Sequence, residues 1–307
     1  MLNDWLKEQI DNIRNFLGDY GKLVLLIVSA VIIFSCLIFL NAKTRDGEMV
    51  VAFFDVGQGD SIFIQTPSGK QMLIDGGPND KVMRGLDKEM PMFDRSIDVV
   101  VATHADTDHV TGLIPVLEKY KVAHIIESPV KGKTNIFDDL EKHIANENAD
   151  VHVGKIGDVI DFNDGVIATV LYPGVGERGT DAVCRGDTNE CCVSILLTYL
   201  DKNFLFSCDL PSAREGKLIE SGLLPHDITV YKAGHHGSKY SSGDQLLSYI
   251  KPYYSVISAG KDNRYGHPNI ETLDRLKKYS KVILSTIESG EVKFVMRGGE
   301  LRFETGK

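Results

Sequence analysis

The sequence predicts an α/β domain of four layers, in which two β-sheets pack face to face and helices cover both outer faces (an αββα sandwich). Three observations support this fold class. Apolar segments typical of buried strands follow one another closely over residues 49–74, strands and amphipathic helices then alternate over residues 97–287, and a last hairpin is expected at 291–304. Two sheets covered by helices accommodate this order of elements.

Each element follows from the spacing of its apolar residues and from the turns that bound it. The first strand is expected at 49–56, and the next two, at 61–66 and 71–74, form a hairpin. The stretch 173–190 is Gly-rich and charged, so a long loop is expected there. Further strands are expected at 97–103, 122–126, 158–162, 166–172, 193–200, 203–208, 228–233, 253–259 and 281–287, and helices at 110–120, 136–146, 211–221, 243–251 and 270–279.

The composition describes a folded domain with an acidic surface. The chain has 307 residues, of which 43% are hydrophobic and 25% charged, so it can bury a core and shows no sign of extensive disorder. Its net charge of −9 excludes the global basic field of a typical nucleic-acid-binding protein. A polyanionic substrate would have to be held locally, by metal ions or by a few basic side chains.

One segment is too apolar for a globular domain. Residues 23–40 carry no charge and are long enough to cross a bilayer, so we expect a single transmembrane anchor there. Residues 1–22 are more acidic than the start of a signal peptide and form a short amphipathic segment. Residues 41–48 are expected to be a linker to the main domain, 49–307. More basic residues precede the span than follow it, which favours an extracytoplasmic main domain.

The most informative stretch is Thr-His-Ala-Asp-Thr-Asp-His-Val-Thr-Gly, residues 103–112, directly after an apolar strand. A solvated helix N-terminus would also favour aspartate there. Imidazole and carboxylate groups at this spacing can, however, supply two adjacent metal ions from one loop. The four candidate ligands are His104, Asp106, Asp108 and His109.

Two further segments with metal-binding side chains also follow predicted strands. Asp209 is either the N-cap of the next helix or a carboxylate that bridges two metal ions. His235 and His236 lie between two glycines, which let the backbone come close to a bound group. Adjacent histidines point in different directions, so one can bind metal while the other faces the substrate. A surface histidine pair is the alternative.

The loop 261–268 holds groups that can hydrogen-bond or pair with phosphate, including Arg264, Tyr265 and His267, although a solvated loop is the alternative.

Loops that follow strand ends gather at one edge of a layered α/β fold. Two divalent ions about 3.5–4 Å apart can lower the pKa of a shared water and clamp a phosphoryl group.

We therefore expect a site for two divalent metal ions. His104 and Asp106 would hold one ion and Asp108 and His109 the other, while Asp209 bridges them and one of His235 and His236 completes a shell. His267 or the other histidine of the pair would contact the substrate or protonate the leaving oxygen.

The cysteines leave the redox state open. Cys36 lies in the predicted span, and in an external domain Cys184 with Cys191 would be the simplest pair. One alternative is four free thiols in a reducing compartment. Another is that Cys191, Cys192 and Cys208 are small core residues of two neighbouring strands.

The loop 103–112 resembles the His-x-His-x-Asp-His motif of metallo-β-lactamase-fold hydrolases, with Asp106 in the second histidine position. Residues 49–300 are similar to the C-terminal domain of the ComEC/Rec2 competence proteins. This resemblance implies a four-layer αββα metallo-β-lactamase fold, two metal ions, and nuclease activity on the non-transported strand during DNA uptake. The further motifs that carry it are Phe54-Asp55-Val56-Gly57-Gln58-Gly59-Asp60-Ser61, Leu73-Ile74-Asp75-Gly76-Gly77, Gly234-His235-His236-Gly237-Ser238 and Tyr265-Gly266-His267-Pro268.

The resemblance also implies roles for individual residues. Asp75 matches an aspartate that supports a metal ligand without binding the metal, and Gln58 and Asp60 would lie near the metals. The expected catalytic residues are Asp108, His267 and Asp60. The expected substrate-binding residues are Gln58, Asn189, Ser238, Lys239, Arg264 and Tyr265.

The chain departs from the pattern of this family at three places. Asn189 falls where many relatives carry a histidine, so a ligand is expected to be missing there. Ser207-Cys208-Asp209 stands where Thr-Gly-Asp is expected, and Cys191-Cys192 stands where Asn and Ser are usual. Asp106 makes one metal shell richer in oxygen, which shifts its preference from zinc towards manganese.

Three functions remain open. The first is a membrane-anchored phosphodiesterase, a nuclease with DNA as substrate and a separate DNA-channel protein as partner, because one span cannot form the channel that the relatives carry. The second is a hydrolase of a lactone or of an envelope phosphodiester, as in the phosphorylcholine esterases that share these motifs. The third is a degenerate domain that binds DNA or a channel partner, which the missing histidine favours.

Overall fold

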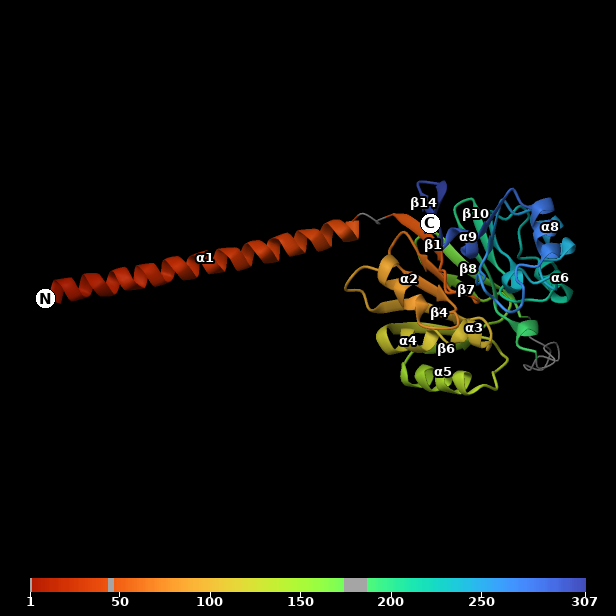
Figure 1. Ribbon diagram of the computed structural model, residues 1–307, viewed down its shortest axis with the longest axis horizontal. Helices are drawn as coiled ribbons and strands as arrows, with labels where there is room; N and C mark the ends of the chain where they lie inside the picture. Colours follow the sequence, from red (N-terminus) through yellow and green to blue (C-terminus); the bar gives the residue numbers. More distant parts are fainter. Residues whose placement is uncertain (1, 44–46, 174–186) are drawn as a thin grey trace. The chain divides into compact units, whose positions relative to one another are not determined.

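The computed structural model describes residues 2–43, 47–173 and 187–307. The chain divides into two units, of which the first contains a single helix, α1 (Leu2–Lys43). The sequence predicts a boundary at residue 22 between the amphipathic segment and the transmembrane anchor, but the helix continues across it. Its stretch Trp5–Leu37 is long and apolar enough to cross a membrane and is not buried within the structure (Figure 1).

The second unit contains two β-sheets (Figure 1). Sheet A has eight strands in the order β15-β14-β1-β2-β3-β4-β5-β6, and sheet B has seven in the order β13-β12-β11-β10-β9-β8-β7. The strands of sheet A are β1 (Glu48–Phe53), β2 (Ile62–Gln65), β3 (Gln71–Ile74), β4 (Ser96–Ala102), β5 (Lys121–Glu127), β6 (Asp150–Val153), β14 (Val292–Arg297) and β15 (Glu300–Thr305). Those of sheet B are β7 (Val159–Asp161), β8 (Val166–Tyr172), β9 (Ser194–Tyr199), β10 (Lys202–Phe206), β11 (Val230–Lys232), β12 (Tyr254–Ile257) and β13 (Val282–Ser285).

Helices cover the outer face of each sheet, and the predicted four-layer αββα fold is confirmed. One apolar core fills the space between the sheets, and a second and a third lie under the helices of sheet A and of sheet B. Sheet A is covered by α2 (Lys81–Glu89), α3 (Thr107–Val110), α4 (Leu113–Lys119) and α5 (Asn135–Asn146). Sheet B is covered by α6 (Ser212–Glu220), α7 (Asp244–Ile250) and α8 (Ile270–Tyr279). The short elements are η1 (Asn189–Cys191), η2 (Gly234–Gly237) and α9 (Thr286–Ser289).

Parallel strands of both sheets end where the predicted site residues begin. In sheet A, β3 and β4 are parallel neighbours that lead to Asp75 and to the loop 103–112. In sheet B, the parallel neighbours β10, β11 and β12 lead to Asp209, to the histidine pair and to the loop 261–268. The topology therefore gathers these loops from two sheets.

The structure differs from the sequence-based expectation in several elements. The strand expected at 281–287 ends at Ser285, and α9 begins at the next residue. Helix α2 is not predicted because five of its nine residues are charged, which weakens the apolar pattern. Strand β6 is exposed at all four positions, so it lacks the alternation that marks a half-buried strand. The helix expected at 110–120 is divided at Gly112, where a Cβ atom would collide with the carbonyl oxygen of Gly76.

An aromatic group in the core between the sheets gives a test of this packing. Phe294 is 1% exposed, and its ring centroid lies 6.1 Å from those of Phe53 and Phe204 and 5.2 Å from that of Tyr254. We expect Phe294→Ala to lower the free energy of unfolding by about 3–5 kcal/mol, because it leaves a cavity. Urea unfolding of the full chain in detergent would measure this. The control, Phe303→Ala, removes a ring that is 41% exposed and should cost clearly less; equal effects would contradict the assignment.

Candidate metal centre

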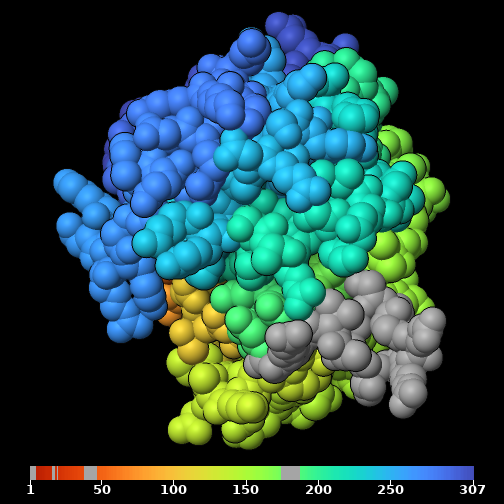
Figure 2. All heavy atoms as spheres, turned by 90° about the vertical axis from the view of Figure 1, so that its right-hand side faces the viewer, coloured from red at the N-terminus to blue at the C-terminus, as the bar shows by residue number. Residues whose placement is uncertain are grey.

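Histidine and aspartate side chains from both sheets meet at the ends of the parallel strands. Segments of the chain that are far apart in sequence, coloured orange, yellow, green and blue, come together on one face of the main domain (Figure 2). Two groups of buried residues each have ligand atoms within 4.8 Å of one another: Asp60, His109, Asp209 and His236, and Asp75, His104 and His109. These groups can bind metal, and together they form the cluster described below.

Asp209 stands at the centre of the cluster. Its Oδ2 lies 3.3 Å from Nε2 of His109, 3.3 Å from Nε2 of His236 and 3.5 Å from Nε2 of His235. Its Oδ1 is buried and has no hydrogen-bond partner among the described residues. The N-cap of α6 is Pro211, and no side chain makes a capping bond there, so the N-cap interpretation of Asp209 is wrong. A carboxylate shared by three imidazoles suits a bridging metal ligand.

Asp75 and Thr103 orient the two histidines of sheet A. Oδ2 of Asp75 lies 2.7 Å from Nδ1 of His109, and Thr103 donates two hydrogen bonds to Asp75, from its backbone N–H and from Oγ1. Oγ1 of Thr103 also lies 3.0 Å from Nδ1 of His104, whose buried Nε2 has no hydrogen-bond partner among the described residues. These contacts turn both Nε2 atoms to the cluster, as partners behind metal-binding histidines do.

Lys232, which the sequence-based prediction omits, is fully buried and neutralises Asp60. Its Nζ lies 2.7 Å from Oδ2 of Asp60, while Oδ1 of Asp60 lies 3.2 Å from Nδ1 of His236. That Nδ1 also lies 3.0 Å from the carbonyl oxygen of Ser258, so it is the protonated nitrogen and leaves Nε2 for the cluster. Burial opposes ionisation of Asp60, but Lys232 and His236 outweigh it and hold its pKa below the usual range.

The histidine pair has an unusual backbone. His235 and His236 both lie in the left-handed region, with φ of 49° and 54°, and their rings are inclined by 80°. His236 is buried and His235 is partly exposed. Nε2 of His236 also lies 3.4 Å from Oδ2 of Asp108. His236 therefore belongs to the interior of the cluster and His235 to its mouth.

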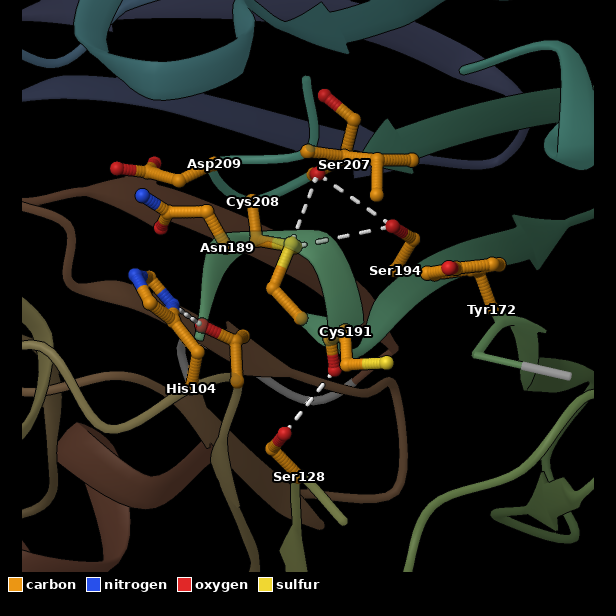
Figure 3. The surroundings of a disulfide bond; sticks show 12 residues. His104, Ser128, Tyr172, Asn189, Cys191, Ser194, Ser207, Cys208 and Asp209 are labelled. Atoms are coloured by element: carbon orange, nitrogen blue, oxygen red, sulfur yellow. Dashed lines mark hydrogen bonds between the residues drawn. A yellow bond between two sulfur atoms is a disulfide. The ribbon is translucent and has the colours of Figure 1, made fainter. Parts of the chain in front are cut away.

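Asp106 lies at the margin of the cluster. Its Oδ2 is 3.8 Å from Nε2 of His104, its side chain is 39% exposed, and Thr188 donates a hydrogen bond to its Oδ1. The side chain of Asn189, which follows Thr188, points into the same region as His104 and Asp209 (Figure 3). Its Oδ1 is buried without a hydrogen-bond partner among the described residues.

The loop 261–268 borders the cluster through ring contacts, edge-on between His267 and His235 and stacked between His267 and Tyr265. The ring of His267 lies 5.5 Å from that of His235 and 5.7 Å from that of Tyr265, and the Arg264 guanidinium lies 5.0 Å from the Tyr265 centroid. Burial and the neighbouring charges of His235 and His236 lower the pKa of His267 to about 4. His267 is therefore neutral at pH 7 in the metal-free protein, which favours contact with the substrate over protonation of a leaving oxygen.

Three other predicted substrate-binding residues have local partners in the structure. Oε1 of Gln58 accepts a hydrogen bond from the backbone of Gly260, and the Ser238 hydroxyl oxygen accepts one from the backbone of Tyr240. Lys239 is exposed and its Nζ lies 5.2 Å from the Tyr240 ring centroid. These contacts connect Gln58 to the loop 261–268 but do not bring Ser238 or Lys239 to the cluster.

Cys192 and Cys208 form a disulfide (Figure 3). The sequence favours Cys184 with Cys191 as the simplest pair and leaves free thiols and core packing open. Cys192 and Cys208 are both buried, at 0% and 3% exposure, so they are core residues of neighbouring segments as well. The predicted partner of Cys191, Cys184, lies outside the described residues.

The charges of the cluster also determine which of its histidines are protonated. Burial opposes the charged form of His109 and of His236, but nearby carboxylates, Asp209 first, raise both pKa values well above the usual range. Burial and His109 lower the pKa of His104. The metal-free cluster thus holds protons on two histidines, and a divalent cation would displace them. Nε2 of His104 and Oδ1 of Asp209, which have no hydrogen-bond partner in the described part of the chain, and the mixed imidazole–carboxylate donors fit such an ion.

A four-layer αββα sandwich with buried histidines and aspartates at one sheet edge defines a metal-dependent hydrolase fold. Residues 54–261 match the Metallo-beta-lactamase superfamily, and the chain belongs to it. YhfI of Bacillus subtilis, a metallo-beta-lactamase fold protein, has a similar structure, with a TM-score of 0.52 and 10% identity over 85% of this chain and 100% of that chain. This likeness shows the fold alone.

The predicted resemblance to competence proteins is confirmed. The chain is 26% identical over 274 residues to ComE operon protein 3 of Bacillus subtilis (strain 168), covering 82% of this chain and 33% of that protein. It is 27% identical over 258 residues to competence protein ComA of Neisseria gonorrhoeae, covering 83% of this chain and 33% of that protein. The chain thus spans about a third of the length of these curated relatives.

The raised histidine pKa values predict how the stability of the metal-free protein depends on pH. A group whose folded pKa exceeds its unfolded value, about 6.5 for histidine, stabilises the fold fully below that value. The contribution is lost as the pH rises through the folded pKa. For His109 and His236 we therefore expect the unfolding temperature in chelator to fall from pH 6 to pH 9.

His109→Gln is the matched variant for this measurement, since it removes one of the two protonated groups. Its unfolding temperature should depend less on pH than that of the wild type. Parallel curves for the two proteins would show that His109 is not protonated in the metal-free fold.

Proposed function

We propose that this protein is a membrane-anchored, two-metal phosphodiesterase that cleaves DNA during DNA uptake. The observation that carries the proposal is the shared carboxylate of Asp209, which lies within 3.5 Å of three imidazoles from two loops. Similarity to competence proteins supports DNA as the substrate.

Two divalent ions, zinc or manganese, would be held by the two halves of the cluster. His104 and Asp106 would hold one, Asp108, His109 and His236 the other, and Asp209 both. When bound, such ions supply an activated water and stabilise charge on a phosphoryl group. Asn189 would stand beside the first half and offer its Oδ1, which has no hydrogen-bond partner among the described residues, where the resemblance implies an imidazole.

The side chains around the cluster orient the ligands. Asp75 fixes His109 through Nδ1, and Asp60 acts through His236, so we place both as positioning residues. Lys232 keeps Asp60 ionised without contact with solvent. Asp106, Asp108 and His235 are the partly exposed side chains among the described residues of the cluster, so we expect the substrate to approach from their side.

The loop 261–268 would receive the nucleic acid. Tyr265 is 52% exposed and carries the Arg264 guanidinium over its ring. An aromatic face can stack on a base irrespective of sequence, and a guanidinium can pair with phosphate. Neutral His267 would hydrogen-bond the substrate between this loop and the cluster. Such local contacts suit a protein with a net charge of −9.

We place the main domain outside the cytoplasm, anchored through residues 23–40. The buried Cys192–Cys208 disulfide supports this side of the membrane, because disulfides persist in oxidising compartments. The distribution of basic residues around α1 favours the same orientation. A separate channel protein would then be the partner that carries the transported strand.

A substrate panel tests this function. We expect the full chain in detergent, loaded with Mn²⁺ or Zn²⁺, to cleave single- or double-stranded DNA and bis-p-nitrophenyl phosphate. His104→Ala and Asp209→Ala should abolish cleavage, because each removes a ligand that no neighbour can replace. Asp75→Asn should weaken metal binding about 10–100-fold.

His143→Ala is the control, since His143 lies on α5 outside the cluster and should leave cleavage unchanged. Hydrolysis of a lactone or of an envelope phosphodiester, but not of DNA, would favour the second function. DNA binding without metal or cleavage would favour a degenerate binding domain, which Asn189 in place of histidine supports.

A further inference from the structure

The Cys192–Cys208 disulfide joins two segments that border the cluster. Cys208 directly precedes Asp209, and Cys192 directly follows η1, which contains Asn189. The two Cα atoms are 6.3 Å apart, and the residues are 16 positions apart in sequence. In Figure 3, Asp209 and Asn189 lie on one side of the bond. The crosslink is therefore one residue away from the bridging carboxylate.

The backbone at Cys208 needs such support. Its φ is +46°, in the left-handed region that side chains other than glycine rarely adopt. This conformation turns the chain so that Asp209 enters the cluster, and the carbonyl oxygen of Cys208 accepts a hydrogen bond of 3.1 Å from the backbone of His235. One residue thus sets the position of Asp209 and contacts the histidine loop.

Little else near Asp209 fixes its side chain in the metal-free protein. Among the described residues, Oδ1 has no hydrogen-bond partner, and Oδ2 contacts only the histidines of the cluster. On the other side of the bond, the Ser128 hydroxyl donates to the Cys191 carbonyl at 3.0 Å. The disulfide is the covalent connection between these two supports.

We propose that the Cys192–Cys208 disulfide positions the residues of the metal centre. The bond fixes Asp209 relative to Asn189, and its reduction lowers the metal affinity. This inference rests on the proposed metal centre. Reduction by a phosphine transfers two electrons to the disulfide; two protons from water complete the thiols, and the phosphine takes up the oxygen as phosphine oxide. The loosened Cys208 segment no longer holds the carboxylate against the histidines.

Calorimetric titration of the full chain with Zn²⁺ tests the proposal. We expect Cys192→Ser/Cys208→Ser to bind Zn²⁺ about 10–100-fold more weakly than the wild type, the range found when partners behind ligands are lost. Cys192→Ser/Cys208→Gly should recover part of the affinity, because glycine adopts the left-handed conformation without a crosslink. Wild-type protein reduced by a phosphine, then freed of it under anaerobic conditions, should also bind Zn²⁺ more weakly than the oxidised protein. Because Cys191 is disulfide-bonded as well, the serine variant isolates the effect of the Cys192–Cys208 bond.

Phe294→Ala is the control for general destabilisation, since it weakens the core between the sheets but should keep the wild-type Zn²⁺ affinity. Unchanged affinity in the reduced wild type or in a folded serine variant would overturn the positioning role and leave the metal centre intact. A wild type that binds no Zn²⁺ would instead overturn the metal centre and this proposal together.

A separate group of possible ligands lies on sheet A, away from the cluster. His124 of β5 pairs in register with Asp150 of β6, and His152 follows two residues later on the same face. Oδ2 of Asp150 lies 3.1 Å from Nε2 of His152 and 3.8 Å from Nδ1 of His124. All three are exposed, and their ligand atoms lie within 4.8 Å of one another.

The two histidines also line a cavity of about 410 Å³ between the edges of the two sheets, together with apolar residues such as Val159 and Ile160 of β7. Two imidazoles and one carboxylate are donors that suit Zn²⁺ or Ni²⁺ better than Ca²⁺ or Mg²⁺. We infer that His124, Asp150 and His152 form an accessory site for a divalent transition metal, independent of the proposed function.

Equilibrium dialysis against Ni²⁺ tests this second site. We expect His124→Ala/His152→Ala to bind one ion fewer per chain than the wild type while the cluster keeps its ions. The control, His143→Ala/His226→Ala, removes two other histidines outside the cluster and should not change the stoichiometry. Equal stoichiometry in the wild type and in the first variant would overturn the accessory site.

Discussion

Burial of three carboxylates among basic side chains is the constraint on which the site depends. Asp60, Asp75 and Asp209 are each at most 2% exposed, and an unpaired buried charge costs several kcal/mol. Each has a basic partner: Lys232 for Asp60, His109 for Asp75, and the imidazoles of the cluster for Asp209. The negative charge of Asp209 is therefore available to a metal ion because histidines hold it ionised until the ion arrives.

These partners also explain why the fold is built from two sheets. Asp75, His104 and His109 come from the ends of β3 and β4 in sheet A, while Asp209 and His236 follow β10 and β11 in sheet B. Neither sheet carries a complete set of ligands. The core between the sheets therefore holds together the two sheets that carry these side chains.

Much of the fold and of the candidate metal cluster could be predicted, because apolar periodicity marks buried strands and charged groups at strand ends are conspicuous. The sequence also indicated that Asp209 and one of His235 and His236 belong with the loop 103–112, but not which histidine of the pair. It could not show Lys232 as the partner of Asp60, because two residues on different sheets leave no mark in local spacing. The pairing of Cys192 with Cys208 also escaped prediction, although they flank neighbouring strands of sheet B, because spacing along the chain does not fix which cysteines meet.

Because each half of the cluster belongs to a different sheet, an ion held by both halves would crosslink the two sheets. Ligand binding to the folded state alone stabilises it in proportion to the logarithm of ligand concentration. The metal concentration would then set the stability of this edge of the domain as well as its chemistry. Where metal is scarce, the domain would open first between the two sheets at this edge. Its stability would therefore depend on the metal concentration around it.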